Sequence, residues 1–228
     1  MRRQQFLFTA LSSPVFVDCA LLIGGAQAQQ NFDKVEIKTE KLSPTTFVLF
    51  GAGGNVGVSV GEDALFKSKV PPSPKVALPV VTFSTDVTSH INGDEVYGFH
   101  VPKAHTDGDT VVQFKKSNVI HMGDVFFNGW YPFIDVSSGG SPESVIAAVD
   151  RVLAMSDDNT KIIPGHGPVS GKGDLKAYRD MLATVSGRVK ALMKEGKKLD
   201  EIKAAKPSAE FDEKWGKAFI ETLFAIYS

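Results

Sequence analysis

The spacing of apolar residues changes near Ser141, and this change constrains the fold more than any other feature of the sequence. Before this point apolar residues come in short or alternating runs typical of strands, and after it they recur every three or four residues, as on a helix face. Ser141 and Pro142 form a typical helix start, a Ser cap followed by Pro at the first helical position. Strands followed by helices favour a sheet covered by helices.

The individual elements follow from these patterns and from turn residues. Strands are predicted at 35–38, 45–50, 56–60, 86–92, 95–101, 110–114 and 118–121, with hairpin connections at the glycine-rich 51–55 and at Asn92-Gly93-Asp94. Helices are predicted from Pro142, over 175–192 and over 211–227, with a short strand at 161–163 that ends at Pro164. The sequence therefore contains a β-α-β unit late in the chain.

Length and charge limit the class of protein. The 228 residues, 43% of them hydrophobic, suit one globular domain with a sizeable core. The 25 Lys and Arg residues and the 26 Asp and Glu residues give a net charge of −1, so no basic excess favours nucleic-acid binding. The one cysteine, Cys19, excludes an internal disulfide framework and a four-cysteine zinc site.

Residues 1–28 are predicted to be a secretory signal peptide. Arg2 and Arg3 precede an interrupted apolar stretch, and the sequence A-Q-A at 26–28 is a small-x-small cleavage signature. The alternative is a disordered or buried N-terminal segment, because Asp18 interrupts the apolar stretch. This stretch is too short for a membrane-spanning helix. We therefore expect a periplasmic or secreted protein without a stable membrane anchor.

Three segments place polar, ligand-type side chains just past apolar strands. They are 104–110, which contains His105, 119–124, which ends at Asp124, and 162–168, which contains His166. Strand ends can bring side chains together in one cleft, and imidazole and carboxylate groups are natural ligands of Zn²⁺. Taken singly, each is a weak signal: a loop His is more often a surface or core residue, and Asp124 is suited to capping a turn.

The order of the three segments is more specific than any one of them. H-T-x-G-D is followed by M-G-D and then by P-G-H-G-P, and the glycines beside His166 allow a sharp turn that projects its ring. Together with G-G-N-V-G-V-S-V at 53–60, these stretches resemble the metallo-β-lactamase superfamily of metal-dependent hydrolases. The resemblance covers roughly residues 34–185.

The resemblance implies both a fold and a site. The fold is α/β, an αββα four-layer sandwich formed here by residues 29–228 as a single domain. By resemblance, His105 matches a ligand of a first metal, Asp124 the carboxylate that can bridge two metals, and His166 a ligand of the second metal. With zinc as the metal, the implied reaction is attack of a metal-bound hydroxide on the ester, thioester, amide or lactam carbonyl of a small molecule.

The chain departs from the family in one respect. The family's chief metal motif, H-x-H-x-D-H, does not occur, and the Pro-rich residues 66–78 fill the interval where it is expected. We therefore predict an internal deletion and an incomplete N-terminal sheet. Three ligands cannot satisfy two tetrahedral ions, so at most one Zn²⁺ per chain is expected. The alternative is a non-catalytic binding or structural descendant, or a defective truncated member; the substrate and the oligomeric state are left open.

The remaining histidines and an aromatic loop lead to two further expectations. His121 matches no ligand of the family and is expected to be a buried, hydrogen-bonded, neutral side chain, while His90 and His100 are assigned no role. The aromatic loop 128–133 directly follows the Asp124 strand. It is interpreted either as an apolar wall for a substrate or as a hydrophobic plug over the end of the sheet.

Overall fold

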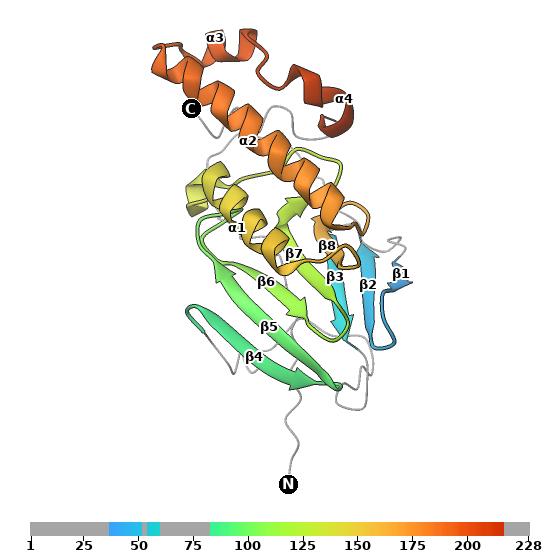
Figure 1. The fold of residues 1–228 in the computed structure, drawn as a ribbon. Coiled ribbons are helices and arrows are strands. Elements are labelled where there is room, and N and C mark those ends of the chain that lie inside the picture. Colours follow the sequence, from blue (N-terminus) through green and yellow to red (C-terminus); the bar gives the residue numbers. More distant parts are fainter. Residues whose placement is uncertain (1–36, 52–53, 60–82, 217–228) are drawn as a thin grey trace, which may run out of the picture.

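The computed structural model describes residues 37–51, 54–59 and 83–216 (Figure 1). The predicted signal peptide at 1–28 and the Pro-rich segment 66–78 lie outside these residues, so the predictions of export and of an internal deletion stay predictions. Within the described part of the chain, no helix combines the length and the apolar character needed to cross a membrane.

The strands form two sheets (Figure 1). The first has the order β1-β2-β3, made of β1 (Lys38–Lys41), β2 (Thr46–Gly51) and β3 (Gly54–Ser59). The second has the order β4-β5-β6-β7-β8, made of β4 (Asp86–Ile91), β5 (Asp94–Val101), β6 (Asp109–Phe114), β7 (Val119–Phe127) and β8 (Lys161–His166). All neighbouring strands are antiparallel except β7 and β8, which are parallel.

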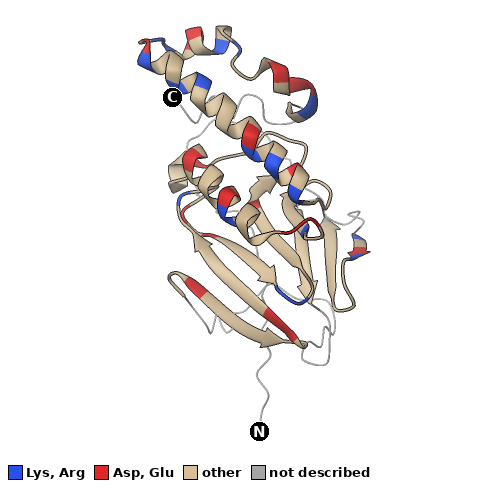
Figure 2. Ribbon diagram, viewed as in Figure 1, with Lys and Arg blue, Asp and Glu red and all other residues tan. Residues whose placement is uncertain are grey.

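The helices follow the strands, as the change of spacing predicts. They are α1 (Pro142–Met155), α2 (Lys172–Lys194), α3 (Leu199–Ala204) and α4 (Asp212–Trp215), with 3₁₀ turns η3 (Val136–Ser138) and η4 (Ala209–Phe211). The predicted start of α1 is confirmed, because the Ser141 side chain accepts a hydrogen bond from the Ser144 N–H and Pro142 is the first helical residue. Acidic and basic residues are interspersed on α1 and α2 (Figure 2), and ion pairs such as Arg179–Asp150 link the two helices.

Alternate residues of the five-stranded sheet face two apolar cores, as period-two alternation requires. Ile120 and Ile162 pack in one core with residues of α1 and α2, whereas their neighbours Val119 and Ile163 pack in another core with Val48 of β2. The sheet therefore lies between a layer of helices and the three-stranded sheet (Figure 1). This arrangement confirms the predicted α/β class with sheets flanked by helices.

Two strands run further than the sequence predicts, and this moves the site residues. β7 continues to Phe127, so Asp124 lies within the strand and not past it. Gly123 has φ +53, and the pairing with β8 shifts register around it. β8 continues through Pro164 to His166. Proline is accommodated there because β8 is an edge strand and lacks regular pairing at this point.

The other predictions hold within smaller shifts. Asn92 and Gly93 both have positive φ, 54° and 75°, and form a two-residue hairpin turn, whereas Asp94, predicted to lie in the connection, is the first residue of β5. β1 begins at Lys38, three residues later than the predicted strand, although 35–36 lie outside the described residues. The helix predicted over 211–227 is described only as η4 and α4, since 217–228 are outside the described residues.

Candidate functional site

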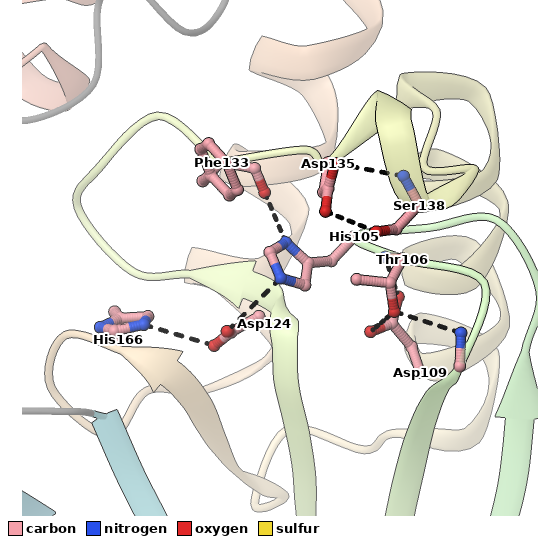
Figure 3. Close-up of polar contacts among 9 residues, drawn as sticks. His105, Thr106, Asp109, Asp124, Phe133, Asp135, Ser138 and His166 are labelled. Atoms are coloured by element: carbon pink, nitrogen blue, oxygen red, sulfur yellow. Dashed lines mark hydrogen bonds and ion pairs between the residues drawn. The ribbon is translucent and has the colours of Figure 1, made fainter. Parts of the chain in front are cut away.

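His105, Asp124 and His166 come together where β7 and β8 end (Figure 3). His105 lies in the loop between β5 and β6, Asp124 in β7, and His166 is the last residue of β8. The Nε2 atom of His105 is 3.7 Å from Oδ2 of Asp124, and the Nε2 atom of His166 is 3.4 Å from Oδ1. The carboxylate thus lies between two imidazoles, and each imidazole faces a different oxygen.

Gly165 allows Asp124 to approach β8 this closely. A Cβ atom on Gly165 would lie 2.1 Å from Oδ1 of Asp124 and 2.6 Å from the backbone of Gly123. The sharp turn is at Gly167, which has φ +96 and whose Cβ would lie 2.2 Å from the carbonyl oxygen of Asn128. Both glycines are therefore required, Gly167 for the predicted turn and Gly165 for a close approach that the sequence did not reveal.

The orientation of His105 is fixed by a backbone carbonyl. Its Nδ1 atom is 2.7 Å from the carbonyl oxygen of Phe133. Because a carbonyl oxygen only accepts hydrogen bonds, this contact assigns the proton of a neutral ring to Nδ1. The lone pair on Nε2 then faces the carboxylate of Asp124. The Nε2 lone pair of His105 and the Asp124 carboxylate are both acceptors, so they repel each other unless a cation or a proton lies between them. Two ligands that share a metal ion face each other in this way.

The turn that carries His166 is held from two sides by asparagine side chains. Asn55 of β3 donates from Nδ2 to the carbonyls of Pro164 at 2.9 Å and of Gly167 at 2.7 Å. Asn128 donates its backbone N–H to the carbonyl of His166 at 2.9 Å and its Nδ2 to that of Pro168 at 2.9 Å. The three-stranded sheet and the β7 end together position His166.

The acidic residue of the H-T-x-G-D segment closes the loop that carries His105. Asp109 accepts hydrogen bonds from the Thr106 N–H at 2.9 Å and from its hydroxyl at 3.2 Å (Figure 3). Burial raises the pKa of Asp109, although the hydrogen bonds from Thr106 oppose the shift. The backbone N–H of Asp135 donates to the His105 carbonyl at 2.9 Å. Asp109 therefore acts on the shape of the loop.

His121 is the buried, hydrogen-bonded side chain that the sequence predicts. It is 3% exposed, its Nε2 donates to the Asn55 carbonyl at 3.1 Å, and its Nδ1 accepts from the Gly123 N–H at 3.0 Å. Burial lowers the pKa of His121, so the neutral ring is favoured. Both ring nitrogens are used within the protein, and His121 is not available as a metal ligand.

The three candidate donors are chemically suited to bind zinc, but they are not arranged as one three-ligand group. Two ligands of a tetrahedral zinc ion lie about 3.3–3.5 Å apart when each bond is about 2.0–2.2 Å. The His166–Asp124 separation matches this spacing and the His105–Asp124 separation slightly exceeds it. However, the described residues contain no group of three His, Cys, Asp or Glu side chains placed to hold one ion. Each imidazole forms a separate pair with Asp124.

Sequence patterns do not mark the residues that support the site. Asn55 lies within the stretch that carries the family resemblance, and Asn128 lies in the aromatic loop. The Phe133 contribution comes from a backbone carbonyl, which side-chain identity does not encode. No local pattern marks these roles, because each depends on a partner 28 to 112 positions away in the chain.

The described fold and the paired donors define a class, an α/β sandwich protein with imidazole and carboxylate groups gathered at one sheet end. The family profile of the Metallo-beta-lactamase superfamily matches residues 28–166, which is more than half of the chain. The chain therefore belongs to the metallo-beta-lactamase superfamily.

Solved structures match parts of the chain at low identity. A metallo-beta-lactamase from Pontibacter korlensis is 22% identical over 46% of this chain and 49% of its own, with a TM-score of 0.41. The sec-alkylsulfatase Pisa1 from Pseudomonas sp. is 21% identical over 55% of this chain and 21% of its own, with a TM-score of 0.43. The chain thus matches about half or less of the length of these proteins. No curated protein matched the sequence.

Replacing Gly165 by Ala is expected to disrupt the site, because the new methyl group would overlap with the Asp124 carboxylate. We expect a loss of about 1–3 kcal/mol in the free energy of unfolding, measured by urea denaturation. The matched control is Gly173→Ala in α2, where a Cβ meets no atom within 4 Å and the stability should hold or rise. Equal stability of the two variants would contradict the proposed close approach.

Acidification is expected to destabilise the protein through His121. The folded state lowers its pKa, so below the unfolded value of about 6.5 the unfolded chain binds a proton that the folded chain does not. This contribution is complete above about pH 6.5 and is lost as the pH falls toward the folded pKa, at up to about 1.4 kcal/mol per pH unit. Urea unfolding across this range should show a weaker pH dependence for His121→Gln than for the parent protein. An identical profile for His121→Gln would exclude His121 as the source.

Proposed function

We propose that this protein is a hydrolase-like member of the superfamily in which one zinc ion would be held weakly by Asp124 and His166, with His105 as the more distant donor. The substrate would be a small molecule with an ester, thioester, amide or lactam carbonyl. The observation that carries the proposal is the Asp124 carboxylate between two imidazole Nε2 atoms, at 3.7 and 3.4 Å. Three separate elements supply these groups, and none of the three side chains is fully buried.

The protein's own residues would prepare this site for a cation. The Phe133 carbonyl holds the Nε2 lone pair of His105 toward the site, and the clamped turn holds His166 on the other side of Asp124. Asp124 supplies the negative charge that favours a divalent cation and is shared by both pairs. When bound, zinc supplies Lewis acidity at neutral pH.

The donor count argues for weak binding and for a single ion. Each His–Asp pair offers two protein ligands, whereas a catalytic zinc site usually has three. Two ions would have to share Asp124 with one imidazole each. One ion would be held by Asp124 and His166, the closer pair, with His105 as the more distant donor.

The alternative is a non-catalytic descendant that keeps part of the site. The specific observation in its favour is the absence of a three-ligand group from the described residues. The two proposals differ in a measurable way, because only the first requires hydrolysis that depends on added zinc.

Zinc binding should involve at most one ion per chain and should require Asp124. We expect Asp124→Asn to weaken zinc affinity at least about tenfold, as loss of the shared anionic ligand removes charge from both pairs. His166→Ala should remove the bound zinc. Elemental analysis, zinc titration calorimetry and a thermal melt with and without chelator measure these effects, since an ion held only by the folded chain raises the melting temperature.

The control for this experiment is Asp150→Asn, at an exposed position on α1 paired with Arg179. Its zinc affinity should equal that of the parent protein. Two tightly held ions per chain would refute the donor count, and unchanged zinc binding by Asp124→Asn would remove this residue from the site. Zinc binding without zinc-dependent hydrolysis of p-nitrophenyl acetate would favour the non-catalytic alternative.

A further inference from the structure

The aromatic loop 128–133 places two large rings beside the two imidazoles. The ring of Phe133 lies 5.7 Å from that of His105, centroid to centroid, and the ring of Trp130 lies 5.9 Å from that of His166. Figure 3 shows Phe133 next to His105 and His166 next to Asp124. The loop therefore borders the site next to both candidate ligands.

Tyr131, one of the two residues between Trp130 and Phe133, is buried and anchors the loop. Tyr131 is fully buried, its N–H donates to the Trp215 carbonyl at 2.8 Å, and its hydroxyl donates to Asp212 at 2.7 Å. Burial raises the pKa of Tyr131, so the hydroxyl stays protonated and remains a donor. Tyr131 thus anchors the loop in the core, while Trp130 and Phe133 lie beside the site.

The loop is also tied to both imidazoles through its backbone. The Asn128 N–H donates to the carbonyl of His166, and the Phe133 carbonyl accepts from the His105 ring. The backbone of the loop therefore keeps a fixed place relative to the candidate ligands. Less backbone conformational entropy is then lost when an apolar group packs on the loop.

The side chain of Phe133 is exposed to solvent beside the site. Among the described residues, the large apolar side chains that are exposed are Ile37, Phe133, Val136 and Met193. Phe133, at 38% exposure, lies in the aromatic loop that borders the site. A single exposed apolar residue is ordinary, but an exposed aromatic ring beside the donor group gives an apolar ligand a surface to cover.

We infer that Trp130 and Phe133 form an apolar wall which binds the acyl chain or aryl group of a carbonyl substrate next to His105 and His166. The substrate class is therefore a carboxylic acid derivative with an apolar acyl group of several carbons. The part of this inference that concerns turnover rests on the proposed function, whereas binding of the apolar group does not.

The binding test uses the full chain and two neutral amides that differ in chain length, acetamide and hexanamide. Trp130 is partly buried beside the site and its fluorescence reports binding, while Trp130→Phe identifies the part of the signal that comes from this residue. We expect hexanamide to bind about tenfold more tightly than acetamide, because partial burial of its additional methylene groups is favourable. Phe133→Ala should reduce this ratio to about threefold or less.

The control variant is Met193→Ala, an exposed apolar residue on α2 at 45% exposure, which should keep the full ratio. Circular dichroism checks that Phe133→Ala is folded, and its backbone carbonyl remains available to His105. Equal affinities for the two amides, or an unchanged ratio in folded Phe133→Ala, would overturn the inference.

A hydrolysis test separates this inference from the proposed function. With zinc present, p-nitrophenyl hexanoate should have a lower KM than p-nitrophenyl acetate, and Phe133→Ala should raise the KM of the hexanoate ester only. Hydrolysis without a chain-length effect would reject the wall and keep the proposed function. No hydrolysis of either ester, with length-dependent amide binding, would reject the function and keep the wall.

Discussion

The close approach of Asp124 to the end of β8 is the constraint on which the site depends. Parallel pairing brings the carboxyl ends of β7 and β8 to the same edge, the irregular pairing at Gly123 turns Asp124 out of the regular ladder, and Gly165 leaves room for its carboxylate. With any side chain at 165, the carboxylate would have to move away from His166. The metal-binding proposal thus depends on the absence of a side chain at position 165 of β8, next to Asp124 of β7.

One loop then connects this carboxylate to both imidazoles and to the surface a substrate would meet. After Phe127, whose ring stacks on His166 at 4.9 Å, the chain leaves the sheet, turns around the buried Tyr131 and returns at Phe133, whose carbonyl orients His105. A change in this loop should therefore alter both ligand orientation and apolar binding. Truncation of the Phe133 side chain alone separates these roles, since the carbonyl remains.

Patterns close together in the chain predicted most of the fold, and contacts between distant residues account for what they missed. The Ser141-Pro142 start and the Asn92-Gly93 turn are local signals, and both were correct. The ends of β7 and β8 were predicted too early, because Gly123 and Pro164 are ordinarily breakers and only an irregular edge pairing accommodates them. The three site residues were found by their order in the sequence, but their separate pairing with Asp124 depends on tertiary geometry.

The central claim is that His105 and His166 share the carboxylate of Asp124 as ligands. The most direct measurement is a long-range ¹H–¹⁵N spectrum of the histidine side chains as zinc is added to the metal-free protein. The account predicts that the Nε2 signals of His105 and His166 shift together, that His121 stays unchanged, and that Asp124→Asn removes both shifts. Zinc-induced shifts confined to other histidines, or independent of Asp124, would contradict it.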